Sequence, residues 1–144
     1  MVVLFISRNL ITFFFILTLF YIGYLTMLPH PSLGIGVGDG GINFVPFAMM
    51  HGLFTEKSLW TFIINVFGNI FLFVPFGFML PWKFPKANTA FWAAVAGASL
   101  SACIEIIQLL FSSRFTDIDD IILNTGGAVI GYLLFKLFFK KSFC

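Results

Sequence analysis

Four long apolar runs, almost free of charged residues, divide the sequence and restrict what it can fold into. A transmembrane helix needs about 20 consecutive apolar residues. Only 10% of the 144 residues are charged, whereas soluble globular domains carry about 25%. The sequence therefore predicts an all-α membrane protein, a single transmembrane domain over residues 1–144, with about four helices. The predicted spans cover about residues 10–28, 59–80, 89–111 and 118–139.

A fifth apolar stretch, residues 42–54, is too short to span a bilayer. Apolar segments of this length are more often interfacial or re-entrant, and we expect one of those two placements. The preceding residues 34–41 are rich in glycine and predict a loop.

The distribution of basic residues indicates the orientation, because Lys and Arg concentrate in short cytoplasmic loops. Five of them flank the spans on one predicted side, and only Lys57 and Arg114 lie on the other, which also carries most of the acidic residues. We expect a multi-pass protein of the cell membrane with both termini in the cytoplasm. The formal net charge of +2 gives no reason to expect a nucleic-acid partner. The five predicted cytoplasmic residues are Arg8, Lys83, Lys86, Lys140 and Lys141.

Polar residues within the spans recur at helical spacing, so each set occupies one helix face. Because polar residues in membrane helices usually face the bundle interior, we expect the three faces to meet near the outer side, in a pocket open to the outside. Small residues accompany them, and we interpret these as positions of close helix packing. The polar sets are Asn65 and Asn69; Ser101, Glu105, Gln108 and Ser112; and Asp120 and Asn124, the last followed by Gly127 and Gly131.

Glu105 is the acidic residue predicted to lie deepest in the membrane. An ionised carboxylate is costly there, so we expect it to be neutral, paired with Arg114, or in contact with water. It is either a structural carboxyl hydrogen-bonded to Asn69 or Asn124, or a group for ligand or proton chemistry.

The loop before the fourth span, residues 112–120, is acidic. Thr116 or Asp117 can cap the following helix, and carboxylates in its first turn complement the helix dipole. Carboxylates around Arg114 also suit a divalent cation, a cationic group of a ligand, or a phosphate held through a metal, which makes Asp117 and Asp120 the metal candidates. We expect no cofactor.

Several motifs, in this order and spacing, resemble the VanZ-like family. They are Asn43-Phe-Val-Pro-Phe47, the Asn69 to Pro81 segment, Glu105-x-x-Gln108, Arg114, and Asp117-x-x-Asp120-x-x-x-Asn124 with the glycines that follow. The resemblance covers about residues 42–135. It implies a small bacterial membrane protein of the cell envelope, of the type named for teicoplanin resistance, and it carries over no catalytic residue.

Three functional hypotheses remain open, one of them a purely structural partner protein in which substitutions at the polar residues act only through stability. The preferred one is a non-enzymatic module that binds a lipoglycopeptide or a lipid-linked envelope precursor, alongside membrane lipids. The alternative is an intramembrane enzyme acting on a lipid phosphate or acyl group, with Glu105 as general acid or base and Asp117 and Asp120 holding a metal. The sequence does not determine the oligomeric state. The predicted binding residues are Asn43, Asn69, Glu105, Gln108, Arg114, Asp117, Asp120 and Asn124.

Overall fold

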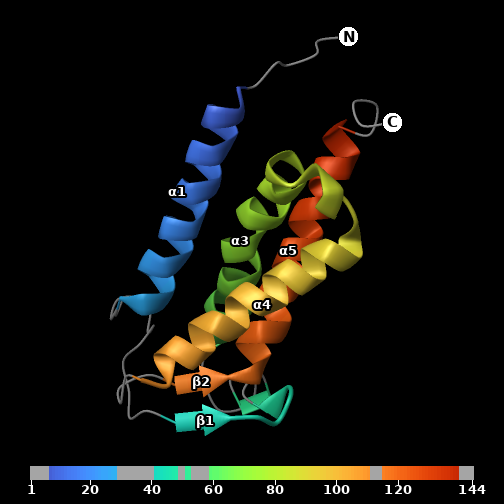
Figure 1. Cartoon of the computed structure of the whole chain (residues 1–144). Coiled ribbons are helices and arrows are strands. Elements are labelled where there is room, and N and C mark those ends of the chain that lie inside the picture. The colour runs from blue at the N-terminus through green and yellow to red at the C-terminus, as the bar shows by residue number, and fades with distance from the viewer. Residues whose placement is uncertain (1–6, 29–40, 49–50, 53–58, 111–114, 140–144) are drawn as a thin grey trace.

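Four long helices and two short strands make up most of the part of the chain that the computed structural model describes (Figure 1). The structure describes residues 7–28, 41–48, 51–52, 59–110 and 115–139. Its elements are α1 (Arg8–Met27), β1 (Gly41–Asn43), α3 (Leu59–Lys83), the 3₁₀-helix η2 (Pro85–Ala87), α4 (Ala90–Gln108), β2 (Phe115–Asp117) and α5 (Ile118–Phe139).

The predicted all-α membrane class is confirmed, because α1, α3, α4 and α5 are each long and apolar enough to cross a membrane. Their bounds follow the four apolar runs to within a few residues. Helices α1 and α4 begin at side-chain caps: Ser7 Oγ accepts a hydrogen bond from the N–H of Leu10 (3.3 Å), and Thr89 Oγ1 accepts one from the N–H of Trp92 (3.2 Å). Such caps satisfy N–H groups that the first helical turn leaves without a partner.

The short apolar segment that follows the first loop begins as a strand, which the sequence did not predict. β1 pairs in parallel with β2, with Ile42 opposite Thr116 and Asn43 opposite Asp117. Two three-residue strands are too short to show a period-2 pattern, and their partners are more than 70 positions apart. Residues 49–50 and 53–54 lie outside the described part of the chain, so an interfacial placement of the whole segment stays a prediction.

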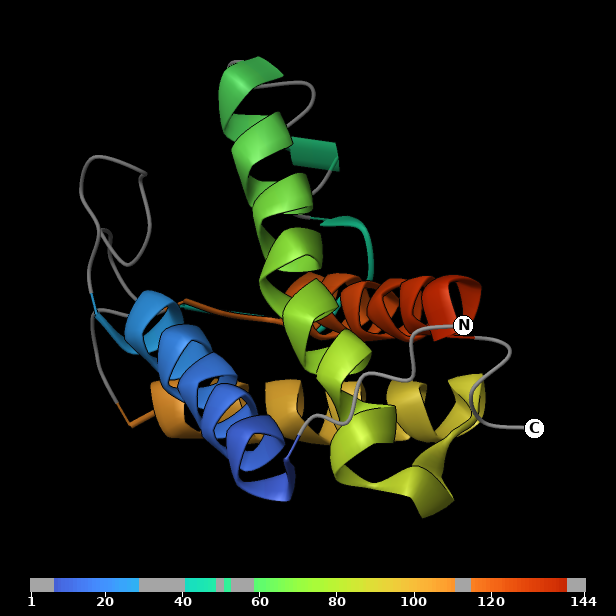
Figure 2. The same cartoon turned by 90° about the horizontal axis from the view of Figure 1, so that it is seen from above.

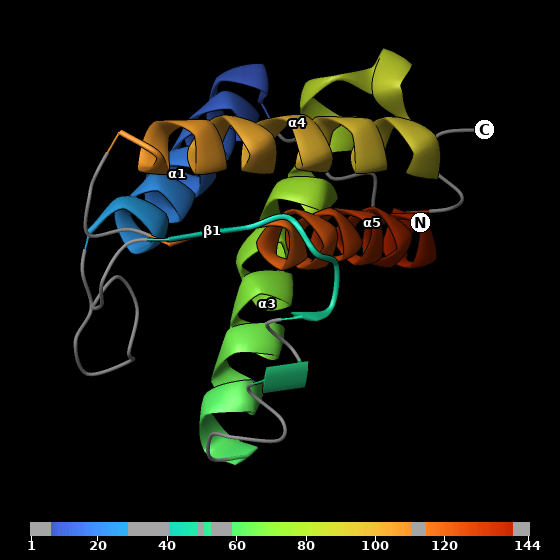
Figure 3. The same ribbon diagram turned by 90° about the horizontal axis from the view of Figure 1, so that it is seen from below.

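Helix α5 forms the centre of the bundle and packs against both α3 and α4. Figures 2 and 3 show α5 beside α4, while α3 crosses them and its first half extends away. Small residues permit these contacts: a Cβ added at Gly127 or at Gly131 would collide with a backbone carbonyl of α3. On the other side, a Cβ at Gly97 would lie 2.6 Å from the Cβ of Ala128. The predicted role of these small residues in close packing is confirmed.

The two ends of the bundle differ in charge. We call the end that carries β1 and β2 the strand end, and the opposite end, where α1 begins and α3 and α5 finish, the lysine end (Figure 1). Every acidic residue in the described part of the chain lies at or near the strand end, and the described basic residues lie at the lysine end. The charges thus separate as predicted, and the assignment of the lysine end to the cytoplasm stays a prediction. The basic residues are Arg8, Lys83, Lys86 and Lys136.

Candidate functional site

The strand end is covered by a cap segment, residues 41–48, whose polar contacts point inward. Asn43 Nδ2 donates to Asp117 Oδ1 (2.9 Å) and to the carbonyl oxygen of Val45 (3.3 Å), and its Oδ1 accepts from the N–H of Val45 (3.0 Å). The N–H of Phe47 donates to Asp119 Oδ1 (2.6 Å). The strand pairing and these bonds hold the cap segment over the start of α5.

Asp117, one of the two predicted capping residues, caps the N-terminus of α5. Its Oδ1 accepts a hydrogen bond from the N–H of Asp119 (3.0 Å), the second residue of α5. A carboxylate in this position satisfies a free N–H of the first turn and complements the helix dipole. The same oxygen accepts from Asn43, so the side chain of Asp117 joins the cap segment to the helix.

Glu105 is buried beneath β2, with 4% of its surface exposed. Its Oε2 accepts from the N–H of Asp117 (3.1 Å), and its backbone carbonyl oxygen accepts from Thr116 Oγ1 (3.4 Å). The two residues expected to bond Glu105, Asn69 and Asn124, donate elsewhere. Strand β2 places the N–H of Asp117 against the Glu105 carboxylate. This contact depends on the pairing of β1 with β2, which the sequence did not predict.

The three polar faces meet on α5 as predicted. Asn69 Nδ2 of α3 donates to Asp120 Oδ1 (2.7 Å), and Asn124 Nδ2 donates to Ser101 Oγ of α4 (2.9 Å). Asn124 Oδ1 is buried and accepts no hydrogen bond from the described residues. The interface between α4 and α5 therefore carries polar groups from the strand end down to Asn124, whose Oδ1 remains available as an acceptor among the described residues.

Two predicted site residues stand apart from this cluster. Gln108 Nε2 donates to the carbonyl oxygen of Thr26 (2.9 Å) in the last turn of α1, so it joins α4 to α1 instead. Arg114 lies outside the described residues, and its predicted pairing with Glu105 stays a prediction.

We call Glu105, Asp117, Asp119 and Asp120 the acidic cluster. Burial raises the pKa of the Asp117 carboxyl above its ordinary value; the N–H of Asp119 and the amide of Asn43 oppose that shift, and the Asp119 carboxylate adds to it. Across the described ranges, no three His, Cys, Asp or Glu side chains are placed to hold a metal ion. The cluster offers hydrogen-bond acceptors rather than a formed metal site.

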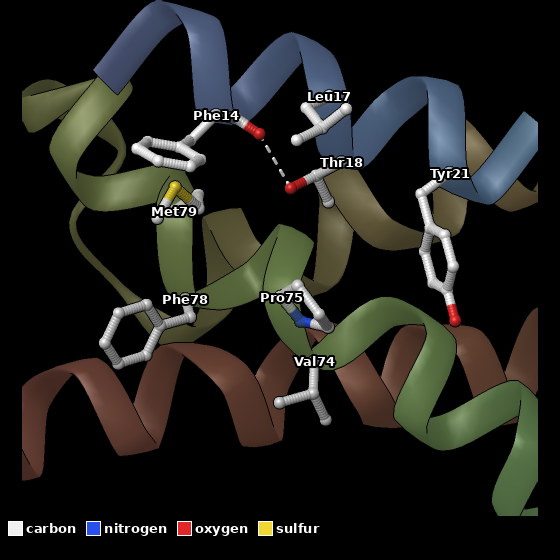
Figure 4. Close-up of a pocket in the computed structure, with 8 residues that line it drawn as sticks. All are labelled: Phe14, Leu17, Thr18, Tyr21, Val74, Pro75, Phe78 and Met79. Atoms are coloured by element: carbon white, nitrogen blue, oxygen red, sulfur yellow. Dashed lines mark hydrogen bonds between the residues drawn. The ribbon is translucent and has the colours of Figure 1, made fainter. Parts of the chain in front are cut away.

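We predicted a pocket open to the outside, but Glu105, Asp117 and Asp119 are buried, and only Asp120 of the acidic cluster is half-exposed. Asp117 is 3% and Asp119 1% exposed, because the cap segment covers them. The outer surface of the cap segment is apolar, with large exposed side chains at Ile42, Phe44, Val45 and Phe47. A cavity of about 520 Å³ lies elsewhere, between α1 and α3 (Figure 4). No sequence pattern predicted this cavity, since α1 carries no polar stripe.

Comparison with known proteins places these features in a family. The VanZ/LLP1 family model matches residues 13–139. Protein VanZ of Enterococcus faecium is 38% identical over 69 residues, which are 48% of this chain and 42% of that protein, so the match spans less than half of the relative's length. No solved structure matches. Because the family model covers most of the chain, including every element described above except the first five residues of α1, the chain belongs to the VanZ/LLP1 family.

Proposed function

We propose that this protein is a non-enzymatic binding module of the cell envelope, whose strand end engages an amphiphile from outside the membrane. The amphiphile is a lipoglycopeptide such as teicoplanin or a lipid-linked cell-wall precursor. The observation that carries the proposal is the arrangement of buried acceptors directly beneath an exposed apolar cap segment. Membership of the VanZ/LLP1 family supports it.

The chemistry of the two layers suits the two parts of such a ligand. Peptide and sugar groups present N–H and O–H donors, and ionised carboxylates are pure acceptors. The exposed side chains of Phe44, Val45 and Phe47 provide apolar surface for an acyl chain, and burying each methylene contributes about 0.8 kcal/mol. A ligand that displaces the hydrogen bonds from Asn43, Phe47 and Asn69 would meet the carboxylates of Asp117, Asp119 and Asp120, which these groups now occupy.

Binding is testable with purified protein in nanodiscs, titrated by calorimetry with teicoplanin and with a lipid-linked peptidoglycan precursor. We expect Asp120→Asn to weaken binding about tenfold or more, because a hydrogen bond to a charged group contributes ~1.5–3 kcal/mol. Tyr132→Phe is the matched control, since it removes a hydrogen bond from the hydroxyl to the carbonyl oxygen of Asn88 (3.2 Å) away from the strand end. Wild-type protein that binds neither ligand would refute the proposal.

The proposal also requires the strand end to face outward. In intact cells, we expect a membrane-impermeant maleimide to label a cysteine introduced at Val45, and to label one introduced at Lys86 only after the cells are permeabilised. The opposite labelling pattern would reverse the topology and exclude the proposed site. Both positions are exposed in the structure.

A further inference from the structure

The side chain of Asn65 lies in a membrane-spanning helix and forms no hydrogen bond with any other described residue. It is half-buried, in the first half of α3. A polar side chain is costly in a membrane helix unless it is paired or reaches water. A side-chain amide carries two N–H donors and an oxygen with two acceptor positions. The amide of Asn65 is therefore available to a ligand.

Helix geometry places Asn65 beside the acidic cluster. Residues four apart lie on one face of a helix with their Cβ atoms ~5–6 Å apart, so Asn65 is the neighbour of Asn69. Asn69 Nδ2 in turn donates to Asp120 Oδ1 (2.7 Å). Asp120 is the half-exposed member of the acidic cluster, and among the described residues its Oδ2 accepts no hydrogen bond. The three side chains form a row of polar groups at the strand end.

The surface of α3 beside this row is open. Gly68 is exposed, and a Cβ added there would point into open space. It lies three positions after Asn65 and directly before Asn69, so it borders the row on the helix surface. The first half of α3 also extends away from α4 and α5 (Figures 2 and 3). A ligand chain can therefore approach the helix closely beside the two amides.

The row offers donors as well as acceptors, and this favours one class of ligand group. A phosphate presents acceptors only, and here it would lie beside the carboxylate of Asp120. A peptide backbone presents one N–H and one C=O per residue, so it can bond to both kinds of group. An extended peptide turns equivalent groups to the same side every second residue, ~6.6–6.8 Å apart. Asn65 and Asn69 are separated by ~6 Å along the axis of α3, which is close to that repeat.

We propose that Asn65 is a further binding residue and that, with Asn69 and Asp120, it binds an extended peptide portion of the amphiphile. This inference rests on the function proposed above and adds the part of the ligand that is recognised. The peptide is the stem of a lipid-linked precursor or the core of a lipoglycopeptide, since both present the same backbone groups.

Calorimetry in nanodiscs tests the inference with three ligands: teicoplanin, a lipid-linked disaccharide-peptide precursor, and the same precursor without its peptide. We expect the wild type to bind the peptide-bearing precursor about tenfold more tightly than the peptide-free one, because the peptide adds at least two hydrogen bonds. Asn65→Leu should remove most of this difference and should weaken the binding of teicoplanin severalfold. Asn9→Leu is the matched control, with the same substitution at an exposed residue of the lysine end, and it should change neither.

Filling the open surface beside the row is a second test. Gly68→Leu should weaken binding of the peptide-bearing precursor severalfold, whereas Gly126→Leu, at an open position on α5, should leave it unchanged. The loss in Asn65→Leu is measured on each ligand that the wild type binds, with the fold of each variant verified by circular dichroism.

The two proposals fail in different ways. Wild type that binds the peptide-free precursor as tightly as the peptide-bearing one would overturn the role of Asn65 and leave the proposed function standing. Undiminished binding in Asn65→Leu, or an equal loss in Asn9→Leu, would have the same meaning. Wild type that binds none of the three ligands would refute the proposed function and this inference together.

Discussion

Asp117 joins the cap segment, β2 and α5 through one carboxylate oxygen, so its removal should destabilise the strand end as a unit. Asp117→Ala loses the cap of α5, for which typical costs are ~0.5–2 kcal/mol. It also loses the bond from Asn43 Nδ2 (2.9 Å), a bond to a charged acceptor, for which ~1.5–3 kcal/mol is usual. We expect the free energy of unfolding to fall by about 2–4 kcal/mol, since the two contributions share one group and add incompletely.

Asp117→Asn separates the hydrogen bonds from the charge. An amide retains one acceptor oxygen, so we expect this variant to lose about half as much stability or less. Reversible unfolding in mixed micelles, followed by circular dichroism, measures both variants. Equal losses in the two variants, or a loss below ~0.5 kcal/mol in Asp117→Ala, would refute the assignment of Asp117 as the joining residue.

The pH dependence of the same measurement has a definite sign. Burial raises the pKa of Asp117 above its ordinary value of 3.8, so the folded state binds the proton more tightly than the unfolded state does. Its contribution to stability is therefore complete below pH 3.8 and is lost as the pH rises through the higher pKa of the folded state. The difference in stability between wild type and Asp117→Asn should shrink or change sign over that interval. A difference in stability between the two proteins that does not change with pH would contradict a raised pKa of Asp117 in the folded state.

Three further predictions concern packing, hydrogen bonding and backbone strain. Gly131→Ala should cost about 1–3 kcal/mol of stability by overpacking against α3, whereas Gly126→Ala, which has open space around it, should cost less than ~0.5 kcal/mol. Thermal unfolding compares the two variants, and similar losses of stability would contradict the close contact between Gly131 and α3. Ser101→Ala should cost ~1–3 kcal/mol because it leaves the buried amide of Asn124 without its acceptor, while the exposed Ser99→Ala should be neutral in the same measurement. Phe47 has φ 65°, so Phe47→Gly should be more stable than Phe47→Ala by roughly 1 kcal/mol; the reverse order would exclude strain at this residue.

The helices could be predicted from the sequence because their causes are local. About twenty consecutive apolar residues predict a membrane span. The helical spacing of the polar residues predicted that the faces of α3 and α4 that carry Asn69 and Ser101 would meet the face of α5 that carries Asn124. Gly127 and Gly131 likewise predicted close packing between helices, although the sequence did not identify α3 as the partner helix. In each of these cases the information lies within one helix.

The remaining features depend on contacts between distant segments. The strand pairing of Ile42 with Thr116 covers Asp117 and Asp119, and β2 places the N–H of Asp117 where it donates to Glu105. The predicted open pocket is therefore largely closed in the structure. Gln108 lies on the predicted polar face, but it is far enough along α4 to reach Thr26 of α1. The groove between α1 and α3 arises from the shapes of two apolar surfaces, and apolar composition alone does not encode where such surfaces separate.

The central claim is that the strand-end carboxylates serve the cell envelope, beyond stabilising the fold. Its most direct test is the teicoplanin susceptibility of a deletion strain complemented with wild type, Asp120→Asn, Glu105→Gln or the control Tyr132→Phe, each at equal membrane abundance. We predict that wild type and Tyr132→Phe reduce susceptibility equally, and that Asp120→Asn and Glu105→Gln fail to do so. Equal protection by all four, or by none, would contradict the claim.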